Sequence, residues 1–326
     1  MEAETARKKV LVITGPTATG KTALGVELAL RLDGEVISAD SMQIYRGMDI
    51  GTAKPTAEER RAVPHHLLDL REATEPFSAA DYAAAAKAAI ADIAGRGALP
   101  ILCGGTGLYL DSLLRPPASP EAENAEEVRA SLYAEAERDG REALYARLSR
   151  IDPEAAAKIH PNNLRRVVRA LEIYDVSGIT KTEWDRRSKE YDAPYRPLVF
   201  SLTWQDRALL AARIEQRVDE MLAAGLYEEA RALYERGALS PETTAGQAIG
   251  YKEFLDCFDG RADAASVRER IVIATRQYAK RQETWFRAHR DFIRLIADEG
   301  GAPRTTDALA DACMPAILEH LRKETN

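Results

Sequence analysis

Cysteine is scarce in this chain, long apolar runs are absent from it, and acidic residues outnumber basic ones. The three cysteines, Cys103, Cys257 and Cys313, lie far apart and form no paired metal-ligand spacing, which argues against a disulfide framework and indicates a reducing compartment. No stretch approaches the roughly 20 apolar residues of a membrane span, and residues 1–8 hold no apolar signal region. We therefore expect a cytoplasmic protein with no membrane partner.

The acidic surplus gives a net charge of −7 at pH 7, which argues weakly against a nucleic-acid partner. The surplus is unevenly distributed, however. Residues 261–294 contain nine Arg or Lys against four Asp or Glu, whereas acidic residues gather in residues 121–127. A basic face is therefore possible on an acidic protein.

A glycine-rich turn follows the first apolar run of the chain. Residues 10–13 form a short buried-strand pattern, residues 15–22 read GPTATGKT, and a helical pattern begins near Leu24. This context predicts a phosphate-binding loop, in which backbone N–H groups and Lys21 hold an anion and the Thr22 hydroxyl reaches Mg²⁺. The loop alone indicates phosphate or diphosphate binding, and it specifies neither a nucleotide nor hydrolysis.

Two further strands are predicted at residues 35–40 and 100–103. In an open parallel sheet, ligands bind beyond the carboxyl ends of the strands, so we expect Asp40 to face the same crevice as the phosphate loop. Residues 104–107 form a second glycine-rich turn, in which the backbone is expected to approach a bound anion and Thr106 supplies a hydroxyl. Together the two turns favour a substrate with two phosphate groups held from two sides.

The pattern changes at residues 115–120, RPPASP, which cannot continue a helix or a central strand. Charged helical segments follow, and residues 164–176 form a helix with Arg165, Arg166 and Arg169 off its apolar stripe. A strand pattern returns at residue 197. We therefore predict an α/β fold: a P-loop NTPase-like parallel sheet core flanked by helices (residues 1–114 and 197–326) with a mainly helical insert (residues 115–196).

Two long helices are predicted after the insert. The helix at residues 207–224 carries Arg213 and Arg217 one turn apart, on one face. The helix at residues 267–289 is basic and contains Tyr278, Trp285 and Phe286. Basic residues interleaved with aromatic ones suit phosphate neutralisation and stacking on unpaired bases, which favours RNA as a partner.

Taken together, these segments resemble the bacterial-type tRNA dimethylallyltransferase family, also called tRNA isopentenyltransferase. The resemblance spans nearly the whole chain and rests on GPTATGKT (15–22), SADSMQIYRGMDIGTAKP (38–55), GGTGLYL (104–110), HPNNLRRVVRALEIY (160–174), RVDEMLAAGL (217–226), QAIGYKE (247–253) and ATRQYAKRQETWFR (274–287). It implies that a dimethylallyl group moves from dimethylallyl diphosphate to N6 of adenosine 37 in tRNA. Diphosphate would leave with the help of Mg²⁺, the insert would clasp the anticodon stem-loop, and we expect a monomer.

The resemblance also implies roles for individual residues. Asp40 would be the general base for the adenine amine, Thr106 would contact the bridging oxygen of the cleaved bond, and Arg217 would stabilise charge on the leaving group. The diphosphate would be held by Gly15, Pro16, Thr17, Ala18, Thr19, Gly20, Lys21 and Thr22, with Thr22 also binding Mg²⁺. Contacts with tRNA would come from Asp40, Ser41, Met42, Gln43, Thr106, Arg129, Arg165, Arg166, Arg169, Gln247, Gly250, Tyr251, Arg276, Gln277, Lys280 and Arg281, with Gln43 reading the edge of the flipped target base.

Three other functions share parts of this pattern. A free-nucleotide (AMP or ATP) isopentenyltransferase would use the same core chemistry but needs no insert to clasp a stem-loop. A small-molecule P-loop kinase would bind ATP and needs neither the insert nor the basic helix. An RNA-binding protein with a degenerate loop would not require the intact Lys21, Thr22, Asp40, Thr106 and Arg217.

Overall fold

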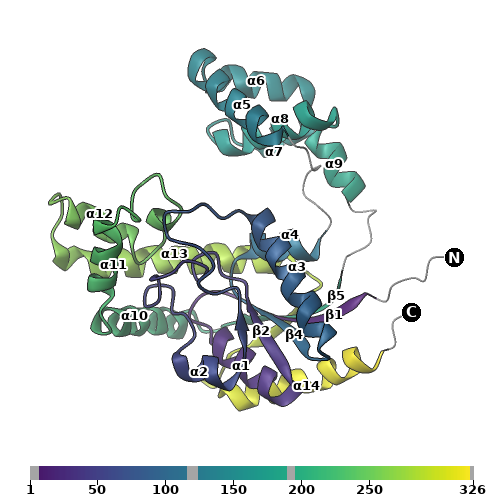
Figure 1. Cartoon of the computed structure of the whole chain (residues 1–326), viewed down its shortest axis with the longest axis vertical. Coiled ribbons are helices and arrows are strands. Elements are labelled where there is room, and N and C mark those ends of the chain that lie inside the picture. Colours follow the sequence, from purple (N-terminus) through teal and green to yellow (C-terminus); the bar gives the residue numbers. More distant parts are fainter. Residues whose placement is uncertain (1–6, 116–123, 189–194, 324–326) are drawn as a thin grey trace. The chain divides into compact units, whose positions relative to one another are not determined.

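A computed structural model of the chain describes residues 7–115, 124–188 and 195–323 (Figure 1). The chain divides into two compact units, Met1–Leu114 with Tyr195–Asn326, and Arg115–Pro194. Each unit is described by itself below. The strand that returns to the core begins at Tyr195, two residues before the predicted position. Residues 116–120 of the predicted break lie outside the described residues.

The core of the first unit is a six-stranded parallel sheet with the order β3-β2-β4-β1-β5-β6. Its strands are β1 (Lys8–Thr14), β2 (Gly34–Ser38), β3 (His65–His66), β4 (Leu99–Cys103), β5 (Tyr195–Thr203) and β6 (Ile293–Ile296). β1, β2 and β4 are buried over most of their length because helices cover both faces of the sheet. Since all pairings are parallel, the carboxyl ends of the strands share one edge.

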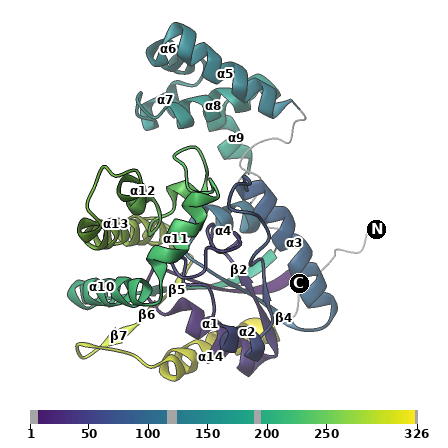
Figure 2. The same ribbon diagram turned by 60° about the vertical axis from the view of Figure 1, so that its left-hand side comes forward.

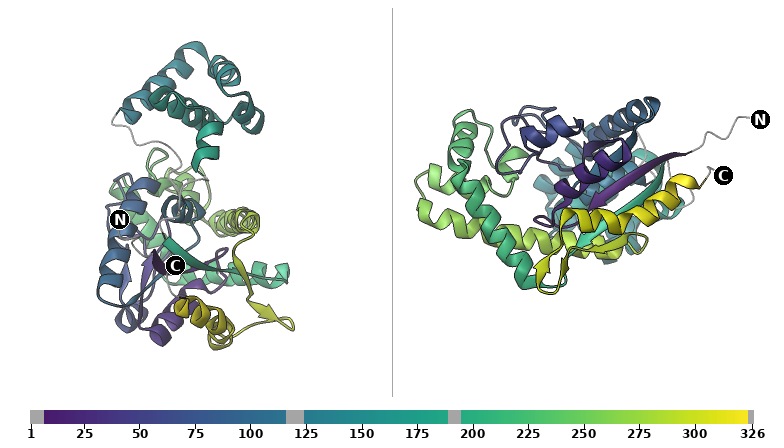
Figure 3. Two further views of the ribbon diagram at one scale, coloured as in Figure 1. Left: turned by 90° about the vertical axis from the view of Figure 1, so that its right-hand side faces the viewer. Right: turned by 90° about the horizontal axis from the view of Figure 1, so that it is seen from below.

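Helices form a layer on each side of the sheet, which confirms the predicted α/β class. α1 (Lys21–Leu32) and α14 (Thr306–Arg322) pack on one face, where side chains such as Leu28 and Cys313 join the sheet in one buried cluster. α3 (Ala79–Gly95) and α4 (Gly107–Leu114) cover the other face. Figure 3 shows α14 running beside α1. The short α2 (Ala57–Ala62) precedes β3, and β7 (Asp298–Glu299) pairs with β8 (Ala302–Pro303) in an antiparallel hairpin.

A second group of helices in the same unit lies beside the sheet (Figure 2). It contains α10 (Arg207–Ala223), α11 (Leu226–Glu235), α12 (Lys252–Phe258) and α13 (Val267–Ala288), with short 3-10 turns at Ala245–Gln247 and Ala264–Ser266. Tyr45 and Met48, from the long loop after β2, are fully buried in the apolar core of this group. The loop after β2 is therefore packed between the sheet and these helices.

The described part of the second unit is mainly helical, as predicted for the insert. Its described helices are α5 (Ala125–Asp139), α6 (Arg141–Ile151), α7 (Pro153–Lys158), α8 (Leu164–Ser177) and α9 (Lys181–Arg187). Leu144, Leu148 and Leu171 are fully buried at its core. Among the helices described in either unit, none combines the length and apolar character that a membrane crossing demands.

Candidate active site

Three loops meet at the carboxyl edge of the sheet. They follow β1, β2 and β4, and β4 lies between the other two strands. Backbone hydrogen bonds join them: Gly104 N donates to Ile13 O at 3.1 Å, Ala39 N to Cys103 O at 2.8 Å, and Thr106 N to Ala39 O at 3.1 Å. Segments that are distant in sequence therefore form one connected surface.

The phosphate loop has the backbone that an anion site requires. Ala18 and Gly20 both adopt left-handed conformations, with φ values of 63° and 90°, and α1 begins directly afterwards at Lys21. Such a turn at a helix start leaves backbone N–H groups without helical partners and favours a negative ligand. The Lys21 ammonium donates to Pro16 O at 2.6 Å, and burial lowers the pKa of Lys21 to about 8.

Not every residue of the predicted diphosphate loop contributes an N–H group. Pro16 has no amide hydrogen, and the N–H of Thr17 donates to Gln282 Oε1 at 2.9 Å. Gly15 packs against β5, where a Cβ would lie 2.5 Å from Leu202 O. Pro16 therefore offers no N–H group and that of Thr17 is already bonded, so we expect the N–H groups of residues 18–22 to hold the ligand.

Asp40 lies at the centre of the charged groups. Its Oδ1 accepts a hydrogen bond from Met42 N at 2.9 Å, and the side chain is half-buried. Burial lowers the pKa of Arg217 on α10, and the negative charge of Asp40 opposes the lowering at both Arg217 and Lys21. The structure thus brings together Lys21, Asp40 and Arg217, which the sequence predicted from three separate segments.

Thr106 completes this group. Its hydroxyl accepts a hydrogen bond from Ser41 N at 3.0 Å, which links the loop after β4 to the residue that follows Asp40. The hydroxyl of Tyr278 on α13 interacts with Thr106, and burial, assisted by the Asp40 charge, raises the pKa of Tyr278 to about 12. A neutral hydroxyl pair therefore stands next to the Asp40 carboxylate.

The glycines of the second turn pack against the protein itself. A Cβ on Gly104 would lie 2.2 Å from Ala39 O, one on Gly105 2.4 Å from Gln282 Nε2, and one on Gly107 2.6 Å from the Trp285 ring. These glycines allow the loop after β2 and helix α13 to approach the Thr106 loop, and the approach of a bound anion to this turn stays a prediction.

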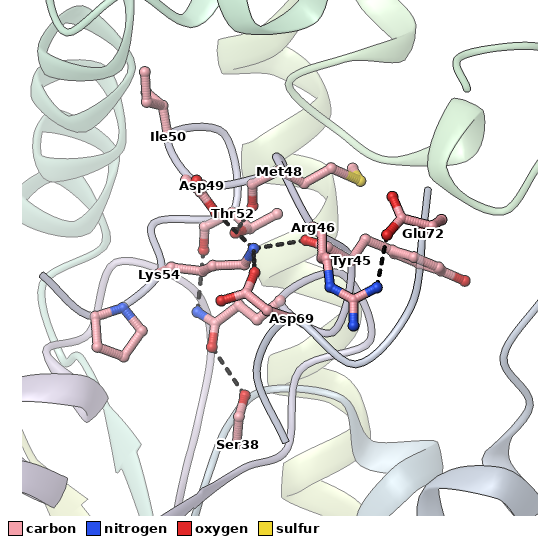
Figure 4. Close-up of polar contacts among 12 residues, drawn as sticks. Ser38, Tyr45, Arg46, Met48, Asp49, Ile50, Thr52, Lys54, Asp69 and Glu72 are labelled. Atoms are coloured by element: carbon pink, nitrogen blue, oxygen red, sulfur yellow. Dashed lines mark hydrogen bonds and ion pairs between the residues drawn. The ribbon is translucent and has the colours of Figure 1, made fainter. Parts of the chain in front are cut away.

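A buried lysine holds the loop that carries Asp40. Lys54 Nζ donates to Tyr45 O, Asp49 Oδ1 and Asp69 Oδ1, each at 2.6 Å, while its side chain is 2% exposed (Figure 4). Nothing in the sequence pattern distinguished Lys54 from a surface lysine.

Gln43 is held within the same loop. Its Oε1 accepts from Ser38 Oγ at 2.9 Å, and its Nε2 donates to Thr52 O at 3.2 Å and to Ala53 O at 3.3 Å. Both ends of the amide are thus occupied by the protein. These bonds make Gln43 a support of the loop, and its reading of a base edge stays a prediction.

Tyr251 was predicted to contact tRNA, and the structure contradicts this. Its side chain is fully buried, and its hydroxyl donates to Glu229 Oε1 at 2.6 Å and accepts from Gly51 N at 3.1 Å. Gly250 is buried as well, whereas Gln247 is exposed and donates to Pro241 O. Tyr251 therefore supports the loop after β2 from within.

Exposed cations and amides lie along α13, as the sequence predicted. Arg276, Gln277, Lys280 and Arg281 are all exposed. Arg276 pairs with Glu215 of α10, and the Arg281 guanidinium stands 5.7 Å from the centre of the Tyr278 ring. This arrangement places positive charge next to Tyr278, which interacts with Thr106.

The four arginines of the second unit that were predicted to contact tRNA divide into two pairs. Arg165 and Arg166 are exposed on α8. Arg129 binds the buried carboxylate of Glu172 through two hydrogen bonds of 2.9 Å, and Arg169 binds the same carboxylate. Arg129 therefore links α5 to α8, and Arg169 pairs with the same carboxylate within α8.

Three residues that line or support this site were not assigned to it from the sequence. Arg213 donates to Ala18 O at 3.2 Å, and Tyr278 and Gln282 reach the two glycine-rich loops from α13. A signal was present for the last two, because residues 278, 282 and 285 recur at helical spacing and share one face of α13.

Comparison with known proteins agrees with this geometry. Residues 43–289 match the family model described as IPP transferase, which covers well over half of the chain. The chain belongs to the IPP transferase family.

Members of the IPP transferase family resemble this chain over most of its length. The tRNA dimethylallyltransferase of Geobacillus thermodenitrificans is 50% identical over 280 residues, which cover 86% of this chain and 88% of the relative. The tRNA dimethylallyltransferase of Anaeromyxobacter sp. is 52% identical over 284 residues, which cover 86% and 92%.

Two solved structures share the fold. The tRNA isopentenylpyrophosphate transferase of Bacillus halodurans is 42% identical, with a TM-score of 0.67, and the match covers 97% of both chains. A eukaryotic dimethylallyltransferase solved while acting on tRNA is 31% identical, with a TM-score of 0.81, and the match covers 98% of this chain and 82% of that one.

Proposed function

We propose that this chain is a tRNA-modifying enzyme that transfers a dimethylallyl group from dimethylallyl diphosphate to N6 of adenosine 37, next to the anticodon. The observation that carries the proposal is the convergence of an anion-binding loop, Asp40, Thr106 and Arg217 at one edge of the sheet. Family membership supports the same reaction class.

The adenine N6 lone pair forms a bond to C1 of the dimethylallyl group while the bond from C1 to the bridging oxygen breaks. The bonding electrons leave with the diphosphate, and a proton from N6 passes to the Asp40 carboxylate. Base assistance of this kind contributes roughly 10²–10⁴-fold.

Charge develops on the leaving diphosphate, and positive groups stand where it would form. Lys21 and the N–H groups of residues 18–22 lie on one side, and Arg217 lies close enough to Asp40 and Lys21 for their charges to interact. Donors that are already oriented in a partly desolvated site stabilise such charge without reorganisation. Thr106 would donate to the bridging oxygen.

Mg²⁺ fits this donor set. Among the described residues no group of three or more His, Cys, Asp or Glu gathers to hold a metal ion. Mg²⁺ usually keeps several waters and takes one or two protein oxygens together with substrate phosphates, which the Thr22 hydroxyl beside the loop would satisfy. When bound, the ion would neutralise charge on the diphosphate.

The substrate experiment uses the full chain, radiolabelled dimethylallyl diphosphate, Mg²⁺ and either an unmodified anticodon stem-loop or AMP. We expect label on the RNA and little on AMP. A free-nucleotide isopentenyltransferase would label AMP with equal or greater efficiency, and a kinase would instead transfer phosphate from ATP.

A further inference from the structure

Gln282 joins the two glycine-rich loops of the site. Its Oε1 accepts a hydrogen bond from Thr17 N at 2.9 Å, and its Nε2 donates to Gly105 O at 2.8 Å. The side chain is 7% exposed, so water competes little for either bond. One amide group therefore fixes the loop after β1 and the loop after β4 at a set separation.

The glycine at position 105 leaves room for the Gln282 amide. A Cβ there would lie 2.4 Å from Gln282 Nε2, so a side chain at this position would displace the amide, and no left-handed φ separately demands glycine there. One turn on either side, Tyr278 interacts with Thr106, and the Trp285 ring packs on Gly107. A single face of α13 thus contacts the loop from residue 105 to residue 107.

We propose that Gln282 is a positioning residue that sets the distance between the diphosphate loop and Thr106. The residues that it holds, Thr17 and Gly105, each directly precede one that would touch the substrate: Ala18 in the anion cradle and Thr106 at the cleaved bond. A shift of about 1 Å between groups that act on opposite ends of a bond can cost about 10²-fold in rate. The proposal rests on the proposed prenyl transfer.

The first test replaces the amide in the full chain and measures transfer of labelled dimethylallyl diphosphate to an anticodon stem-loop. Gln282→Met keeps the length of the side chain but neither donates nor accepts in this geometry, and Gln282→Glu can accept from Thr17 but not donate to Gly105. We expect both to lower kcat/KM for dimethylallyl diphosphate about 10–100-fold, with the stem-loop Kd within about twofold of the parent value. Inorganic diphosphate should also bind more weakly, by at least about tenfold.

Thr284→Ala is the matched control, because Thr284 is exposed on the same helix and its hydroxyl donates only within the helix, to Lys280 O. Folded fractions are measured by circular dichroism. The inference is overturned if folded Gln282→Met keeps kcat/KM within about twofold of the parent value. It is also overturned if the loss in kcat/KM equals the unfolded fraction of the variant, or if the stem-loop affinity falls as much as kcat/KM. Absence of transfer by the unmutated chain would instead refute the proposed function. The measurement of inorganic diphosphate binding would still test whether Gln282 positions the phosphate loop.

A double-mutant cycle tests the geometry independently of folding losses. Gly105→Ala should reproduce the kinetic defect, because the added methyl group displaces the amide. In Gln282→Ala the space is vacated, so adding Gly105→Ala should lower kcat/KM by no more than about twofold further. Losses that multiply in the double variant would show that the two residues act separately and would contradict the proposal.

Discussion

At the scale of single residues, the account depends on the Asp40 carboxylate. It interacts with the charges of Lys21 and Arg217, and the loop that carries it is bonded to Thr106. An exocyclic adenine amine is a poor nucleophile, so a positioned carboxylate at this place has a chemical purpose. In the proposed reaction, Lys21 and Arg217 would stabilise the leaving diphosphate, and Asp40 would accept the proton of the attacking amine.

Asp40→Asn tests that assignment. The amide oxygen can still accept from Met42 N, so the loop should keep its shape, but the group can no longer take a proton. We expect the single-turnover transfer rate to fall about 10²–10⁴-fold with stem-loop affinity nearly unchanged. Asp33→Asn, at an exposed left-handed position after α1, is the control. A transfer rate near that of the parent would show that Asp40 is not the base.

The lowered pKa of Lys21 predicts a pH dependence of kcat/KM. Because burial lowers its pKa to about 8, the ammonium is charged below that pH and loses its proton above it. We expect kcat/KM for dimethylallyl diphosphate to be independent of pH below pH 8. Above pH 8 it should fall, with a limiting decrease of about tenfold per pH unit. The pKa values of Cys103 and Tyr278 are both raised to about 12, so neither accounts for a decline there. A profile that stays level to about pH 9.5 would contradict this assignment.

At the scale of elements, the sequence predicted β1, β2, β4, β5 and the long helices from their apolar patterns, but it did not predict β3 or β6. It placed Lys21, Asp40 and Thr106 at one edge because parallel strands bring their carboxyl ends together, whereas Arg217 was assigned to the site by the family resemblance. It did not foresee the pairing of polar side chains: Tyr251 and Gln43 carry polar groups that look free in sequence but are hydrogen-bonded within the protein. Only three-dimensional pairing reveals such partners.

Lys54 tests how the loop after β2 is held. Lys54→Met keeps the aliphatic stem but leaves Asp49, Asp69 and the Tyr45 carbonyl without their shared donor. The two carboxylates are partly exposed, so we expect a loss of about 1–3 kcal/mol in the free energy of unfolding, measured by urea denaturation. Lys87→Met on α3 is the exposed comparison. Equal denaturation midpoints for the two variants would contradict this role.

Helix α8 of the second unit is tested through its exposed arginines. Arg165→Ala with Arg166→Ala should weaken stem-loop binding most at low salt, and the slope of log K against log salt should flatten by about one for each phosphate that the variant no longer neutralises. Arg150→Ala, exposed on α6, is the control. Fluorescence anisotropy across a salt series measures both quantities. An unchanged slope would show that Arg165 and Arg166 do not neutralise RNA phosphates.

At the scale of the whole molecule, the chain combines a core that is common among phosphate-transferring enzymes with features that such enzymes do not need. The core supplies an anion loop at the edge of a parallel sheet. The helical second unit, with its exposed Arg165 and Arg166, and the basic surface of α13 are the additions. They favour an RNA acceptor over a free nucleotide. In the proposed reaction, the phosphate loop holds the leaving diphosphate while bonds form and break at carbon.

The most direct measurement of this account is the fate of label from dimethylallyl diphosphate doubly marked in the prenyl group and in the β-phosphate. With Mg²⁺ and an unmodified anticodon stem-loop, the account predicts that the prenyl label appears on N6 of a single adenosine and that an equal amount of phosphate label is released as diphosphate. Prenyl label found only on AMP, or phosphate label attached to any acceptor, would contradict it.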